Sequence, residues 1–204
     1  MRAVRTIVSC LVAGVALLSA ASAAAQTTPV RLRGAITAID GNTVTLAVRD
    51  GSTAQVKLAD NWSVNLVVPA SMSDIKPGTF VGIASLGSDG ERTALEVLIF
   101  PEAMRGAGEG HYDWDLQPKS MMTNATVATV AGVSDGQTLK LDYKGGGTQN
   151  IKVKPGTPIV TFEPGKREDA KVGAKVFVGA QKAADGSMTA ARMAVGKDGL
   201  TPPM

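Results

Sequence analysis

The segment "GEGHYDWD", residues 108–115, concentrates the side chains of this chain that could carry out chemistry. It holds the only histidine, one of the two tryptophans, one of the two tyrosines and three carboxylates. Imidazole and carboxylate groups suit zinc and similar divalent ions, and methionine sulfur suits Cu(I). The candidate metal ligands in and near the segment are Glu109, His111, Asp113, Asp115, Met104, Met121 and Met122.

The spacing of these donors matches no established metal motif. The second histidine of HExxH is missing, and so are the fixed oxygen positions of an EF-hand loop. Tyr112, Trp114 and Leu116 alternate with Asp113 and Asp115, which is the pattern of an extended, half-buried segment. We therefore expect a connector that packs its apolar side chains against neighbouring structure and needs no cofactor. Metal binding is the alternative hypothesis.

Catalysis finds little support in the residue types. A nucleophile–base pair needs a histidine beside a serine or cysteine, and only His111 is available, without a G-x-S-x-G motif. The glycine-rich "KGGGT" (144–148) lacks the lysine and hydroxyl that end a phosphate-binding loop, and it falls at an expected hairpin. The prediction is a protein that is not an enzyme, with a hydrolase as the third hypothesis.

The first 25 residues have the pattern of a signal peptide. Arg2 and Arg5 precede the apolar run from Ile7 to Leu18, and the small residues Ala23 and Ala25 precede the expected cleavage site. As a helix, this run would span about 18 Å, which is too short for a bilayer core of about 30 Å. We expect an exported protein, periplasmic or secreted, without stable membrane insertion after cleavage.

Beyond this segment the sequence repeats itself. Residues 41–65 align without a gap onto residues 136–160, and residues 74–84 and 89–99 correspond to 169–180 and 185–195. The order of features is the same in both copies, which indicates an internal duplication. The identical pairs in the ungapped stretch are Gly41/Gly136, Thr43/Thr138, Leu46/Leu141, Gly51/Gly146, Thr53/Thr148 and Lys57/Lys152.

Each copy has the pattern of short β-strands. Val44, Leu46 and Val48 alternate with polar or small residues, and Asp50-Gly51 is a strong hairpin signal. A small sheet protects its edges best by closing on itself, so we expect an all-β fold of two tandem small OB-like β-barrels. The expected division is a signal peptide (1–25), a lead (26–30), a first barrel (31–100), a connector (101–121), a second barrel (122–196) and a tail (197–204).

The first copy resembles a known family. Its pattern G-x-[IV]-x-x-[IV]-D-G-x-T-[VL]-[TK]-[VL] is met by "GAITAIDGNTVTL", residues 34–46, and "DIKPGTFVGIA" (74–84) and "SDGERTALEVLI" (88–99) follow it. These segments resemble the exported bacterial family called domain of unknown function 5666. The resemblance implies small OB-like barrels, often in tandem behind a signal peptide, and brings no catalytic residues. The second copy departs from the pattern, with extra residues before Asp135-Gly136 and no counterpart of Gly34.

Charge and aromatic content narrow the choice of partner. Cleavage would remove Cys10, the only cysteine, and two of the 21 basic residues, leaving 19 against 18 acidic ones. Binding of single-stranded nucleic acid needs a basic groove with stacking aromatics, so no nucleic acid is expected. We expect a non-catalytic binding or structural module, whose partner is an unknown envelope protein or a small ligand.

The expected ligand site lies where the connector meets the two barrels, at His111, Tyr112 and Trp114. Trp62 is added because the alignment places it opposite Thr157, which makes it an aromatic that the copies do not share. A residue of this kind belongs either to the core or to a contact surface, and the core is favoured.

Overall fold

The computed structural model describes residues 27–204. All regular structure in this range is β-strand, apart from single 3-10 turns. No helix within these residues is long and apolar enough to cross a membrane. The signal peptide predicted at residues 1–25 lies outside the described range.

Five strands form a closed barrel, called here the first barrel. β1 pairs with β2 and with β11, β2 pairs with β3, and β11 pairs with β12, all antiparallel. The parallel pairing of β12 with β3 closes the barrel. Its strands are β1 (Thr28–Asp40), β2 (Thr43–Val48), β3 (Thr53–Pro69), β11 (Lys175–Lys182) and β12 (Met188–Gly196).

Five of the remaining strands form a second ring of pairings, called here the second ring. Antiparallel pairs join β5 to β4, β4 to β7, β7 to β8 and β8 to β9. Two residue pairs, Arg92 with Ile151 and Thr93 with Lys152, then link β5 to β9 in parallel. The strands of this second ring are β4 (Phe80–Ser88), β5 (Glu91–Ile99), β7 (Met121–Val133), β8 (Gly136–Tyr143) and β9 (Gly147–Val153).

Each of these units combines strands from both halves of the chain. The first barrel takes three strands from the first half and two from the second, and the second ring has the reverse composition. The core of the first barrel accordingly contains six buried residues from Ile36 to Val64 and seven from Ala170 to Val195. These pairings differ from the division predicted above, in which residues 31–100 and 122–196 each closed separately.

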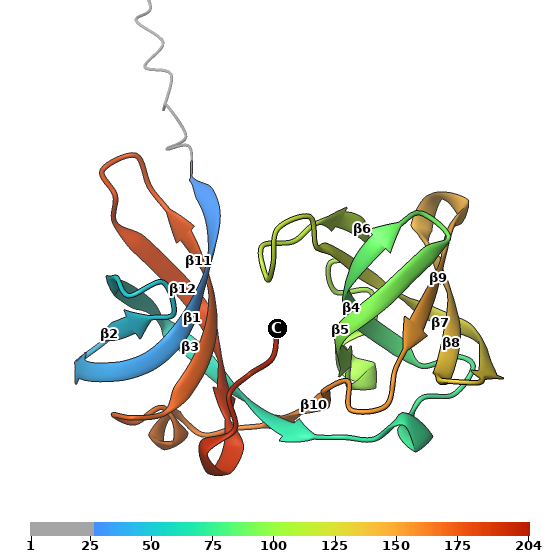
Figure 1. The fold of residues 1–204 in the computed structure, drawn as a ribbon. Helices are drawn as coiled ribbons and strands as arrows, with labels where there is room; N and C mark the ends of the chain where they lie inside the picture. The colour runs from blue at the N-terminus through green and yellow to red at the C-terminus, as the bar shows by residue number, and fades with distance from the viewer. Residues whose placement is uncertain (1–26) are drawn as a thin grey trace, which may run out of the picture.

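The length of β3 explains the exchange. Between Thr53 and Val68 the strand contains no glycine or proline, so nothing turns the chain back into the first barrel. The first residues of β3, 53–57, pair with β2, and its residues 63–67, beyond an irregularity in the register, still pair with β12. Its last residues, Asn65–Pro69, pair with β10 (Ile159–Pro164), which also pairs with β5. In Figure 1, β3 and β10 run along one edge of the molecule from one lobe, which is the first barrel, to the other lobe, which is the second ring.

Several local features agree with the sequence. The hairpin at Asp50-Gly51 is confirmed, because β2 and β3 pair across it and Gly51 has a φ of 88°. Asp50 accepts hydrogen bonds from the main chain and hydroxyl of Ser52. The all-β class is confirmed as well. The order of strands along the first half of the chain is the same as along the second half. That the two halves arose by duplication stays a prediction.

Candidate functional site at the junction of the two lobes

The connector forms an extended segment on the outside of the second ring. β6 (Gly110–Asp113) pairs with β7, with Tyr112 opposite Met122 and His111 opposite Thr123. The chain then turns over residues 114–120, where the Ser120 hydroxyl lies 2.8 Å from the carbonyl oxygen of Trp114. The alternation of half-buried and exposed side chains predicted from the sequence is therefore present from Tyr112 to Leu116, but the extended conformation ends at Asp113.

Beyond β6 the connector contacts the first barrel. The Trp114 ring packs 4.0 Å from the Arg31 guanidinium and 6.3 Å, between centroids, from Phe177. Asp115 accepts a 2.7 Å hydrogen bond from Arg33. Partial burial acts to raise the pKa of Asp115, but this bond and the charges of the two arginines prevail and lower it. The connector thus joins the second ring to β1 and β11.

We expect Trp114→Ala to weaken this contact strongly. The change removes a large apolar surface and a cation–π contact, which together stabilise the folded state by about 2–3 kcal/mol. Urea unfolding followed by circular dichroism would measure the loss. Trp114→Phe keeps a ring over Arg31 and should lose less than half as much. Equal stability of the alanine variant and the natural chain would show that the contact adds nothing.

His111 is built into the wall of the second ring. Its Nδ1 lies 2.8 Å from the Thr123 hydroxyl, its ring stacks at 6.3 Å on Tyr143, and its Nε2 lies 3.9 Å from Asp89. Burial and the positive charge of Arg92 lower the pKa of His111, against the opposing charges of Asp89 and Asp113. The imidazole is therefore neutral near pH 7 and serves the packing of the wall.

The predicted metal ligands do not come together. Within residues 27–204, no three His, Cys, Asp or Glu side chains lie close enough to hold an ion. Glu109 accepts a hydrogen bond from the main chain of Lys144, Asp115 binds Arg33, and Asp113 is exposed. Met122 is buried in β7 beside Met121, and Met104 lies in a separate 3-10 turn. The donors are thus divided among different partners.

Trp62 lies away from the junction site. It packs, partly buried, against the core of the first barrel, and the Arg167 guanidinium lies 5.2 Å from its ring. Arg167 also donates to the main-chain oxygens of Trp62 and Asp60. Of the four residues expected to bind a ligand, Tyr112 and Trp114 therefore meet at the junction, with ring centroids 6.2 Å apart.

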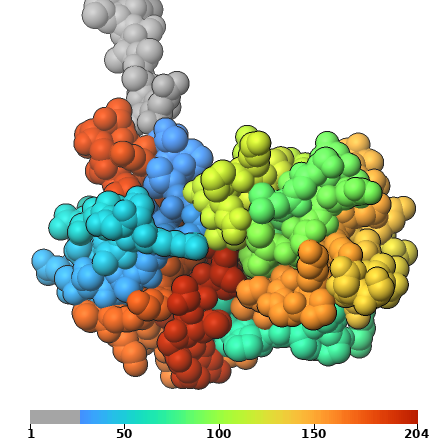
Figure 2. Space-filling view, in the orientation of Figure 1, coloured from blue at the N-terminus to red at the C-terminus, as the bar shows by residue number. Residues whose placement is uncertain are grey.

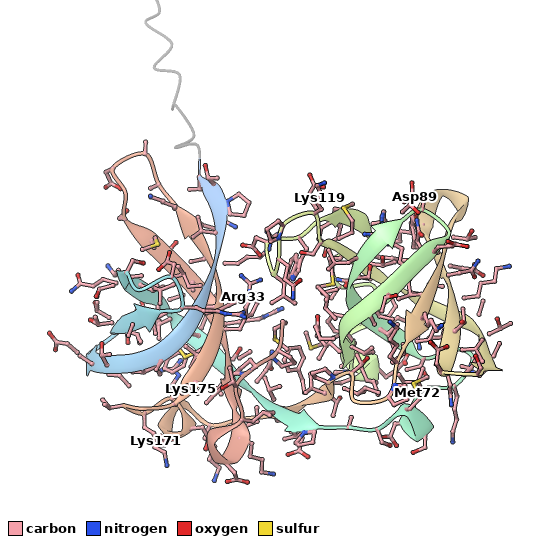
Figure 3. All side chains as sticks on the ribbon, in the orientation of Figure 1. Arg33, Met72, Asp89, Lys119, Lys171 and Lys175 are labelled. Atoms are coloured by element: carbon pink, nitrogen blue, oxygen red, sulfur yellow. The ribbon has the colours of Figure 1, made fainter. Side chains whose placement is uncertain are left out.

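A basic groove beside Trp114 was not predicted. It has a volume of about 480 Å³ and is lined by side chains of the first barrel, of β5, of the connector and of the chain after β12. Three cations border it on neighbouring strands: Arg33 on β1, Arg49 at the end of β2, and Lys175 at the start of β11. Figure 3 shows Arg33 extending from β1 toward the other lobe.

Only one of these cations is neutralised. Arg33 pairs with Asp115, whereas Arg49 and Lys175 have no carboxylate within ion-pair distance among the described residues. The alternation of Val30 and Leu32 with the two arginines of "VRLRG" could have indicated an outward basic stripe on β1. Arg49 and Lys175 join this basic groove only because the strands β1, β2 and β11 pair side by side, and the sequence does not show that pairing.

The face of the second ring toward this junction buries a carboxyl group. Glu96, on β5, is 1% exposed, and neither of its carboxyl oxygens has a hydrogen-bond partner among the described residues. Burial raises the pKa of Glu96 to about 8, against the weaker effects of the Ala84 main-chain amide and the charge of Arg33. The Trp114 Nε1 is likewise buried without a partner. The junction thus holds polar groups that no other residue in the range 27–204 satisfies.

Comparisons with known proteins add no name to this geometry. No protein-family model, no curated protein and no solved structure matches the chain. The site is therefore interpreted from its own residues.

Proposed function

We propose that this protein is an exported, non-catalytic binding module that takes an anionic ligand in the groove between its two lobes. The observation that carries the proposal is the placement of Arg33, Arg49 and Lys175 around one groove, where Asp115 is the only acidic side chain within ion-pair distance of the three among residues 27–204. Cations that lack partners beside a partly enclosed surface attract anionic groups, and arginine presents a planar fork to carboxylate or phosphate.

The walls of the groove support a ligand with apolar parts. Leu95 of β5, Leu116 of the connector and Pro158 line it together with the three cations. A site of this kind orients a charged group through a few polar contacts and gains affinity from apolar burial. Because the walls come from both lobes, a bound ligand would also stabilise the arrangement of the lobes.

Export, the OB-like character of the two units and the relation to domain of unknown function 5666 belong to this proposal. Their support is the sequence of residues 1–25, the size of the five-stranded first barrel and the family pattern of residues 34–46. A non-catalytic role is supported by His111, the only imidazole of the chain, whose Nδ1 bonds to Thr123 within the wall of the second ring.

The test uses inorganic tripolyphosphate as a linear anionic probe, titrated by calorimetry into the protein. We expect a dissociation constant below about 1 mM at low salt that rises at least about 10-fold in about 150 mM salt. The double variant Arg49→Ala, Lys175→Ala should bind about 10-fold more weakly, because two lost cations that contribute about 0.7 kcal/mol each remove about 1.4 kcal/mol of binding free energy.

The matched control removes two exposed lysines from the second ring. The double variant Lys140→Ala, Lys154→Ala changes the net charge by the same amount, and both residues lie outside the groove. It should bind the probe as the natural chain does. Equal weakening in both double variants would mean that the probe responds to overall charge, and the proposed groove would be rejected.

A further inference from the structure

The segment after β12 fills the seam between the two lobes. The chain leaves β12 through a 3-10 turn (Lys197–Gly199) and returns over the barrel toward β1. Gly196 permits this return, because a Cβ at that position would lie 1.6 Å from the main-chain oxygen of Leu200. In Figure 2 the last residues, in red, lie between the first barrel and the second ring.

The end of this segment is buried like a core residue. Met204 is 4% exposed and belongs to an apolar cluster that takes one residue each from β3, β5, β10 and β12. Three phenylalanines surround the cluster. Pro202 is also buried, although residues 201–204 belong to no strand or helix. The members of the cluster are Val67, Leu98, Val160, Ala194 and Met204.

The segment is held as a bound peptide would be held. Among the described residues, the only hydrogen bond to the main chain of residues 201–204 is the 2.7 Å bond from Arg33 Nε to the Met204 oxygen. No neighbouring strand pairs with the segment, so its attachment depends on two buried side chains and one arginine. Extended segments that contain Pro-Pro bind in this manner to aromatic-lined grooves, because their conformation is already restricted.

We propose that the seam is a peptide-binding site for an extended proline-containing segment with acidic residues, which residues 201–204 occupy from within the same chain. The proposal rests on the proposed function, because Thr201, Pro202 and Pro203 line the groove opposite Arg49 and Lys175. An incoming segment takes the place of the Pro-Pro-Met residues and adds acidic side chains, which residues 201–204 do not contain. The partner is thus a protein with an acidic, proline-containing extended stretch.

The internal segment competes with any external one. A tethered segment acts at an effective concentration in the millimolar range, so a peptide of the same sequence cannot displace it at micromolar concentration. The full-length variant Met204→Ser removes the buried anchor and leaves Arg33, Arg49 and Lys175 in place. It should therefore open the site to peptides without changing the basic side of the groove.

The experiment compares two amidated peptides, Leu-Thr-Pro-Pro-Met and Glu-Glu-Leu-Thr-Pro-Pro-Met, on the natural chain and on Met204→Ser. Calorimetry and the summed fluorescence of Trp62 and Trp114 would report binding. We expect the variant to bind the shorter peptide at least about 10-fold more tightly than the natural chain does. The acidic peptide should bind Met204→Ser more tightly than the shorter peptide does. Adding Arg49→Ala and Lys175→Ala to this variant should make the two peptides bind equally.

Three results would overturn the inference: equal affinity for the natural chain and the variant, equal affinity for a scrambled peptide, or no advantage of the acidic peptide. If Met204→Ser loses its cooperative unfolding transition, the double variant Pro202→Gly, Pro203→Gly replaces it. This variant keeps Met204 but removes the conformational restriction of the two prolines, and its peptide affinities are compared with those of the natural chain in the same way. Tripolyphosphate separates the two proposals. If tripolyphosphate binds and neither peptide binds, only the peptide site is rejected. If tripolyphosphate does not bind and the peptides do not bind, the proposed function is rejected as well.

Discussion

A chain cut in the connector is expected to remain one folded molecule. A protease site placed in the exposed turn at residues 117–119 would yield two fragments, each contributing strands to both the first barrel and the second ring. Because neither core is complete in one fragment, the fragments should elute together from a sizing column. They should separate only in denaturant.

Each fragment alone should lose the cooperative unfolding of the whole protein. The first barrel would lack β11 and β12, leaving the apolar inner faces of β1, β2 and β3 exposed to water. The loss of about half of a core removes the net stability of a small domain, which is only about 5–15 kcal/mol. Circular dichroism melting curves of each fragment, and of the mixture, would test this. Two fragments that melt cooperatively when separate would contradict the exchange of strands.

Glu96→Gln is expected to stabilise the protein at neutral pH and to leave it unchanged near pH 4. In the folded protein the pKa of Glu96 is about 8, whereas its ordinary value is 4.5. Between these values the folded state holds a proton that the unfolded state has released, so stability falls as the pH rises through this window. Below pH 4.5 both states are protonated, and the full stability is present.

The size of the effect follows from the distance between the two pKa values. At pH 7 the cost of keeping this carboxyl protonated is on the order of 3 kcal/mol, and a neutral glutamine avoids it. We expect the variant to gain about 3 kcal/mol at pH 7, since the buried amide and the buried protonated carboxyl group lack partners alike and so differ little near pH 4. Urea unfolding from pH 4 to pH 9 would measure both curves. Glu91→Gln, on the exposed start of the same strand, should run parallel to the natural chain, and parallel curves for Glu96→Gln would contradict the assignment.

The candidate site could be predicted only in part. The alternation in "HYDWDL" indicated an extended, half-buried connector, and Tyr112 and Trp114 do meet at the junction. The same segment suggested a metal cluster, and strand alternation does place His111 and Asp113 on one face. The strand ends at Asp113, however, and the turn that follows carries Asp115 to Arg33 of the first barrel. Arg49, Lys175, Glu96 and Met204 were missed, since each gains its role from a strand distant in sequence.

The amino-acid sequence by itself determined the all-β class, the hairpin at Asp50-Gly51 and the faces that are buried, because strand periodicity and glycine turns are local properties. It did not determine which strands share a core. Alternation shows that one face of β3 is buried but carries no information on its partner. The tertiary structure decided this, because the end of β3 extends beyond the first barrel to pair with β10, and strands from both halves then complete each unit.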